Sequence, residues 1–225
     1  MKPFRTLGET RTPDGSRFSL HEHDGDFSLK YNGTQLMTSS WTESELLLAD
    51  EACRWTRPRK APRVVIGGLG LGFSLKRVLE LLGSDARVVV AELLPEVVSW
   101  NREFLGEING KLLEDPRVEV YEGDVYRCIA EAGKSAFDAI LLDVDNGPSF
   151  PIQPDNERLY DPEGLGLLRR ALTPGGRVSF WAADPEPKFP KKLRKAGFAA
   201  SEISARAHRR ARRAIHRIYV GEKPE

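Results

Sequence analysis

The chain has 225 residues, of which 40% are apolar and 30% are charged, and its formal net charge is +1 at pH 7. This composition excludes a disordered chain, and the small net charge excludes a protein drawn as a whole to nucleic acid or membrane. The length suits one α/β domain of ordinary size with a small appendage.

Two cysteines, Cys53 and Cys128, lie far apart among apolar residues and have no metal-ligand spacing. They indicate a reduced, cytoplasmic protein in which both thiols fill core space. No signal peptide and no apolar run of membrane-spanning length is evident in the sequence. No metal is expected, since His21 and His23 lack further ligands.

The first forty residues predict a small antiparallel β-meander. Three tight-turn dipeptides, Asp14-Gly15, Asp24-Gly25 and Asn32-Gly33, separate short alternating runs. A helix over Glu43–Trp55 follows, with Thr42 as its cap and Glu45 closing a capping box.

The pattern of apolar residues changes at the Pro- and Arg-rich segment 57–62. Beyond it, apolar strands without alternation are separated by helices, which predicts a parallel sheet covered on both faces. The expected strands are Arg63–Ile66, Ala86–Ala91, Arg117–Tyr121, Phe137–Val144 and Arg177–Ala182. The expected helices are Phe73–Leu82, Pro95 to about Leu105, Val125–Ala132, Pro162–Leu172 and Pro190–Ala196.

A turn at 173–176 is expected before the fifth strand, and Phe198–Ser204 with His216–Val220 is expected to form a closing antiparallel pair. The predicted fold class is therefore α/β. It is a Rossmann-like doubly wound sheet, mainly parallel with an antiparallel C-terminal hairpin, plus the N-terminal β-meander. The expected division is into a meander and helix over 1–56 and a nucleoside-binding domain over 57–225.

A glycine loop follows the first parallel strand and opens a helix. It contains Gly67, Gly68, Gly70 and Gly72. Glycines permit a tight turn and let a ligand approach the backbone closely. Because the loop stands between a strand and a helix, it is a candidate nucleotide-binding loop.

Three acids stand at the ends of later strands. Glu92 ends the second strand, where an acid takes ribose hydroxyls in nucleotide-binding βαβ units. Asp124 follows the third strand and could accept a hydrogen bond from an adenine amino group. Asp143 ends the fourth strand. Since ligands sit at the carboxyl ends of parallel strands, the sequence predicts that all three surround one pocket.

The expected ligand is an S-adenosyl sulfonium compound. The dinucleotide fingerprint is G-x-G-x-x-G, whereas Gly68 to Gly72 follows G-x-G-x-G. A row of acids also suits a cationic sulfonium better than a pyrophosphate. The loop, Glu92 and Gly123-Asp124 resemble class I S-adenosylmethionine-dependent transferases.

Within that superfamily the chain resembles the spermidine synthase family of polyamine aminopropyltransferases. The resemblance covers the β-rich N-terminal segment, Gly67-Gly68, Glu92, Gly123-Asp124 and the Asp-rich loop after the fourth strand. It implies an enzyme that transfers an aminopropyl group from decarboxylated S-adenosylmethionine to a small-molecule amine.

The same resemblance implies that Asp143 is the catalytic carboxylate. Asp145, or else Asp155 or Glu157, could bind a second ammonium group of a polyamine. A carboxylate suits this chemistry because an amine with a pKa near 10 must lose a proton before it attacks carbon.

The chain departs from the family pattern at the donor's amino group, where Gly70 replaces an Asp, and in the acidic loop, where Asn146 replaces a second Asp. Glu43 and Glu45 stand out of register with the family's N-terminal acids. Two alternatives therefore stay open: methyl transfer from S-adenosylmethionine itself, and a non-catalytic nucleoside- or nucleic-acid-binding module.

The segment Arg206–Arg217 is strongly basic. It is interpreted as a solvated connection between the last two strands, because no aromatic residue interleaves for base stacking; a nucleic-acid patch is the less favoured reading. The acceptor's identity and the oligomeric state are left open, although the N-terminal strands offer an edge that a homodimer could cover.

Overall fold

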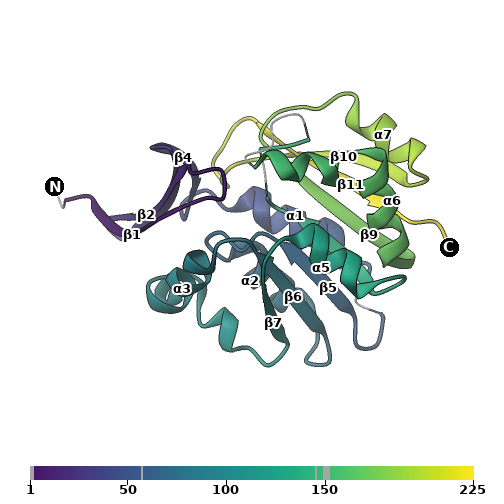
Figure 1. The fold of residues 1–225 in the computed structure, drawn as a ribbon, viewed down its shortest axis with the longest axis horizontal. Coiled ribbons are helices and arrows are strands. Elements are labelled where there is room, and N and C mark those ends of the chain that lie inside the picture. Colours follow the sequence, from purple (N-terminus) through teal and green to yellow (C-terminus); the bar gives the residue numbers. More distant parts are fainter. Residues whose placement is uncertain (1–2, 57, 145, 149–152) are drawn as a thin grey trace.

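The computed structural model describes residues 3–56, 58–144, 146–148 and 153–225. In these residues the chain forms a four-stranded sheet of order β1-β2-β3-β4 and a seven-stranded sheet of order β10-β11-β9-β8-β5-β6-β7 (Figure 1). The small sheet stands at one side of the large one, and the predicted mixed α/β architecture is confirmed.

The small sheet is the predicted antiparallel meander. Its turns lie at the expected dipeptides, where Asp24, Gly25, Asn32 and Gly33 all have positive φ. Such turns match the twist of the flanking strands and therefore favour tight hairpins. The strands are β1 (Arg5–Arg11), β2 (Arg17–His23), β3 (Asp26–Tyr31) and β4 (Thr34–Thr38).

The large sheet is parallel through β7, β6, β5, β8 and β9, and it ends in the antiparallel pair β11 and β10. This confirms the prediction of a mainly parallel sheet with an antiparallel C-terminal hairpin. The strands are β5 (Arg63–Gly67), β6 (Arg87–Glu92), β7 (Val118–Glu122), β8 (Phe137–Leu142), β9 (Leu172–Ala182), β10 (Ala199–Ala205) and β11 (His216–Glu222).

Helices cover both faces of this sheet (Figure 1). The α-helices are α1 (Glu43–Cys53), α2 (Phe73–Leu81), α3 (Pro95–Glu103), α4 (Gly106–Asn109), α5 (Val125–Ala132), α6 (Pro162–Ala171) and α7 (Phe189–Lys195). The short helices η1 (Leu112–Glu114) and η2 (Pro154–Leu159) complete the set. The sequence did not predict α4 or η1.

Side chains of alternate residues in the central strands pack into two separate hydrophobic cores, one on each face of the sheet. Val64 and Ile66 of β5 pack with α1, α2 and α3, whereas Val65 packs with α5 and α6 on the other face. All three side chains are fully buried. Burial of each stabilises the fold by about 1.5–3 kcal/mol, which is why these strands read as continuous apolar runs.

Helix α1 packs on the large sheet although the sequence grouped it with the meander. It contacts α2 and β9, and the Ser179 hydroxyl of β9 donates to the Leu48 carbonyl at 3.2 Å. The predicted capping box is wrong. Thr42 makes no side-chain cap hydrogen bond, and Glu45 is buried at 6% exposure with its carboxylate accepting from Ser44.

The turn expected at 173–176 is a bulge within β9. Phe137 pairs with Leu172, but Ala139 pairs with Arg177, so β9 has extra residues between two rungs of the ladder. The bulge is held by Lys223, which exchanges backbone hydrogen bonds with residues 175 and 176. The strand therefore begins earlier than its apolar run suggests.

The order of the strands creates a switch point at β5. The chain adds β6 and β7 on one side of β5 and then returns to add β8 and β9 on the other side. Connections leave the sheet in opposite directions at such a point, and a crevice opens at the carboxyl ends of the strands.

Candidate active site

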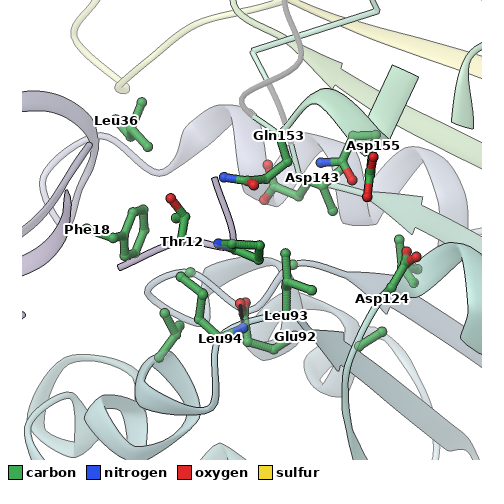
Figure 2. Close-up of a pocket in the computed structure, with 18 of the residues that line it drawn as sticks. Thr12, Phe18, Leu36, Glu92, Leu93, Leu94, Asp124, Asp143, Gln153 and Asp155 are labelled. Atoms are coloured by element: carbon green, nitrogen blue, oxygen red, sulfur yellow. Dashed lines mark hydrogen bonds between the residues drawn. The ribbon is translucent and has the colours of Figure 1, made fainter. Parts of the chain in front are cut away.

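A cavity of about 460 Å³ lies at this crevice, between the carboxyl ends of the parallel strands and the small sheet. In Figure 2, Asp143 and Gln153 line one side and Glu92 and Leu94 the opposite side; Phe18 and Leu36 from the small sheet close one end. The cavity matches the volume of a small-molecule site.

The glycine loop forms part of the cavity wall and requires glycine at two positions. Gly68 has φ 88°, and a Cβ there would lie 2.4 Å from the backbone oxygen of Asp143. Gly70 has φ 51°, and a Cβ there would lie 3.0 Å from Met37 Sδ. Gly68 and Gly70 line the cavity, whereas Gly67 and Gly72 lie outside its lining and shape the loop from behind.

Glu92 stands at the end of β6 and braces the loop. Its Oε2 accepts from the Leu69 backbone N–H at 2.9 Å, and its Oε1 accepts from the Leu94 N–H at 2.9 Å. Burial raises the pKa of Glu92, and the backbone hydrogen bonds oppose that rise. The backbone N–H groups of Gly70 and Leu93 also lower this pKa, so a ligand hydroxyl would share the carboxylate with the backbone of the loop.

Asp124 lies at the other end of the cavity and already has two partners. Its Oδ1 accepts from the Tyr126 N–H at 2.8 Å, which caps α5. Its Oδ2 accepts from Arg158, whose guanidinium lies 4.6 Å from the centre of the Tyr126 ring. A ligand amino group would therefore share the Asp124 carboxylate with the Tyr126 N–H and the Arg158 guanidinium.

Asp143 follows β8 and shares the cavity with a second carboxyl, Glu45 of α1. Ser74 donates its hydroxyl to Asp143 Oδ2 at 3.0 Å. Burial raises the pKa of Asp143, and burial together with the negative charge of Asp143 raises the pKa of Glu45. A carboxyl buried beside a negative charge holds a proton easily, and the two acids together attract a cation.

Glu45 is the functional candidate that the sequence did not reveal. Its spacing fits a helix capping box, and it stands out of register with the acids of the family's N-terminal segment. Gln153 was missed as well, and its buried Nε2 has no hydrogen-bond partner among the described residues. Asp155 lines the cavity, Glu157 does not, and Asp145 lies outside the described residues.

The raised pKa values make the stability of the protein depend on pH. An acid whose folded pKa exceeds its unfolded value keeps its proton longer in the folded state, so stability falls as pH rises between the two values. We expect Glu45→Gln to remove the loss of stability at high pH that comes from ionising Glu45. Relative to wild type, the free energy of unfolding measured in urea should rise by about 1–3 kcal/mol more at pH ~8.5 than at pH ~5.

Glu103 of α3 is exposed, so Glu103→Gln removes one carboxyl without affecting the buried pair and serves as the control. An equal pH response in the two variants would contradict the interaction between Glu45 and Asp143.

Charges are unevenly distributed in the cavity. Its lining contains two arginines among the described residues. Arg127 belongs to α5, the helix that Asp124 caps, and Arg158 belongs to η2 and pairs with Asp124. At the end with Glu45 and Asp143, no cation from the described part of the chain is among the groups that shift the pKa of either acid. This end suits an ammonium or sulfonium group and disfavours a carboxylate.

Two further findings concern the described residues alone. They contain no group of three His, Cys, Asp or Glu side chains placed to hold a metal ion. No helix among them is both long enough and apolar enough to cross a bilayer.

Curated proteins with similar sequences are polyamine aminopropyltransferases. The chain is 33% identical over 148 residues to polyamine aminopropyltransferase 1 of Streptomyces coelicolor, which covers 62% of the chain and 27% of that protein. It is 33% identical over 135 residues to the Nitrosomonas europaea protein, covering 59% of the chain and 38% of the relative. The chain thus spans less than half of these relatives' length. No protein-family model matches it.

Solved structures with the same fold include spermidine synthases. A spermidine synthase in complex with the transition-state analogue AdoDATO superposes with a TM-score of 0.77 at 19% identity, covering 97% of the chain and 74% of that protein. The Thermotoga maritima spermidine synthase superposes with a TM-score of 0.73 at 18% identity, covering 97% and 73% respectively. The fold expected from the resemblance is confirmed.

Proposed function

We propose that this chain, which is similar in sequence to polyamine aminopropyltransferases and in fold to spermidine synthases, transfers an aminopropyl group from decarboxylated S-adenosylmethionine to a small-molecule amine. The observation that carries this proposal is the carboxyl pair of Asp143 and Glu45, which shares one cavity with the glycine loop. An enzyme that must hold a cationic acceptor beside a sulfonium donor needs such a pair.

The donor's nucleoside occupies the part of the cavity between Glu92 and Asp124. Glu92 accepts from the ribose hydroxyls and Asp124 from the adenine amino group, while Gly68 and Gly70 let the donor approach the backbone. Gly67 and Gly72 hold the loop in shape. The apolar side chains of Leu93 and Val125 line the cavity near these acids and suit the faces of a purine.

The acceptor's ammonium binds to Asp143, with Glu45 beside it. As the amine gives up a proton to this carboxyl pair, its freed lone pair attacks the carbon next to the sulfonium. The new C–N bond forms, the C–S bond breaks, and the electron pair of that bond leaves with sulfur as a neutral thioether. Alignment of the two substrates supplies about 7–11 kcal/mol of barrier reduction in such reactions.

The distribution of charge favours the decarboxylated donor. In this arrangement the carboxylate of S-adenosylmethionine would lie towards Glu45 and Asp143, and no cation among the described residues is one of the groups that shift the pKa of either acid. Met37 packs against Gly70 and receives a hydrogen bond from the Leu71 N–H at 3.3 Å, so this wall offers no positive charge either.

We therefore expect decarboxylated S-adenosylmethionine to be preferred over S-adenosylmethionine by at least about tenfold in kcat/KM, which corresponds to about 1.4 kcal/mol. The measurement is mass spectrometry of the products formed from each donor with a panel of diamines and polyamines. Methylated amine as the main product would replace this proposal with methyl transfer. Binding of both donors without any product would favour a non-catalytic nucleoside-binding module.

We place this activity in the cytoplasm. Both cysteines are free and buried, as expected for a protein of a reducing compartment.

A further inference from the structure

The loop between β10 and β11 forms an exposed basic surface. Arg206, Arg209, Arg210, Arg212 and Arg213 are all exposed, and no acid occurs between residues 203 and 221. Arg209 pairs with Glu43 at 3.0 Å. The other four make no ion pair with an acid among the described residues, so their charge is free to meet a partner.

An aromatic side chain from a distant segment lies against this loop. Trp41, just before α1, is 47% exposed, and its ring centroid lies 5.9 Å from that of His208. The backbone N–H of Glu43 donates to the Ala207 carbonyl at 3.3 Å, which fastens the loop to the start of α1. The folded protein therefore supplies the aromatic residue that the Arg-rich segment lacks in sequence.

From these observations we propose that the arginine loop, residues 206–215 together with Trp41, binds a single-stranded nucleic acid. Guanidinium groups contact phosphates bidentately, whereas an exposed indole offers a stacking face to any base. All the cationic side chains of the loop other than histidine are arginine, the residue that combines both kinds of contact. The partner's strand must be unpaired for its base to reach Trp41.

The loop's charge does not serve the amine acceptor. A polyamine is itself cationic and is repelled by a cluster of guanidinium groups. The loop also lies near the cavity, since Glu43 stands two residues before Glu45, and His216 packs against the cavity residue Trp181 with ring centroids 4.9 Å apart. A bound strand would therefore lie near residues of the cavity wall.

The test measures fluorescence anisotropy of a labelled oligouridine of about 12 nucleotides, a length within the range bound by single-strand-binding folds. The full chain is titrated at about 50 and 200 mM salt. We expect binding that weakens with salt. The triple variant R210E/R212E/R213E should lose it, and its salt slope should fall, since about 0.7 counterions are released per phosphate contact.

Trp41→Ala distinguishes stacking from simple charge attraction. One stacked base contributes enough that its loss should weaken binding at least about fivefold, and Trp41→Phe should restore most of it. A charge-matched control is the triple variant K191E/K192E/K195E on α7, where all three lysines are exposed. That variant should bind as wild type does.

The proposal would be overturned by no binding at the lower salt, by equal loss in the α7 control, or by unchanged affinity in Trp41→Ala. The last two outcomes would indicate non-specific attraction to any polyanion. Tighter binding to phosphatidylglycerol vesicles than to oligouridine, unaffected by Trp41→Ala, would assign the loop to a lipid surface instead.

Discussion

Asp143→Asn is expected to lower kcat for alkyl transfer by about 10²–10⁴, the range that a positioned general base contributes. The substituted amide has the same shape and still accepts from Ser74, which donates to Asp143 Oδ2 at 3.0 Å. It cannot take the proton that the amine must lose. Since Asp143 contacts the acceptor and not the nucleoside in the proposed arrangement, affinity for the nucleoside should stay within about twofold.

The comparison uses single-turnover rates and calorimetry with methylthioadenosine, the thioether left after aminopropyl transfer. Asp184→Asn is the matched control, because Asp184 is exposed and lies outside the cavity lining. It should change kcat little. Full activity in Asp143→Asn would remove this residue from the chemistry, and equal losses in the two variants would indicate a general effect of charge.

Glu92→Ala is expected to weaken methylthioadenosine binding by at least about 100-fold. Two hydrogen bonds from ribose hydroxyls to a carboxylate contribute about 1.5–3 kcal/mol each. The substitution also leaves the Leu69 and Leu94 N–H groups without their acceptor, so the glycine loop loses its brace. Both effects act in the same direction on nucleoside affinity.

Glu122→Ala is the control for this experiment. Glu122 ends β7 directly opposite Glu92 in the sheet register, but it is exposed and lies outside the cavity lining. Calorimetry should find its affinity for methylthioadenosine unchanged. An intermediate loss is expected in Glu92→Gln, which keeps one acceptor oxygen. Wild-type affinity in Glu92→Ala would contradict the proposed donor site.

The order of strands and helices, and the edge of the sheet that carries the site, could be predicted from the sequence. Apolar runs such as Val64–Ile66 signal a strand buried on both faces, because local periodicity reflects burial directly. Parallel strands present their carboxyl ends at one edge of a sheet. The positions of Glu92, Asp124 and Asp143 at strand ends were therefore enough to assign all three to one cavity.

Contacts between residues far apart in the sequence were decided by the tertiary structure alone. Glu45 reaches the cavity of Asp143, Met37 covers Gly70, and Trp41 lies on the arginine loop only because α1 and the meander pack at the switch point of the large sheet. Local periodicity carries no information about contacts between residues so distant in sequence. These contacts depend on how whole elements bury their apolar faces against one another.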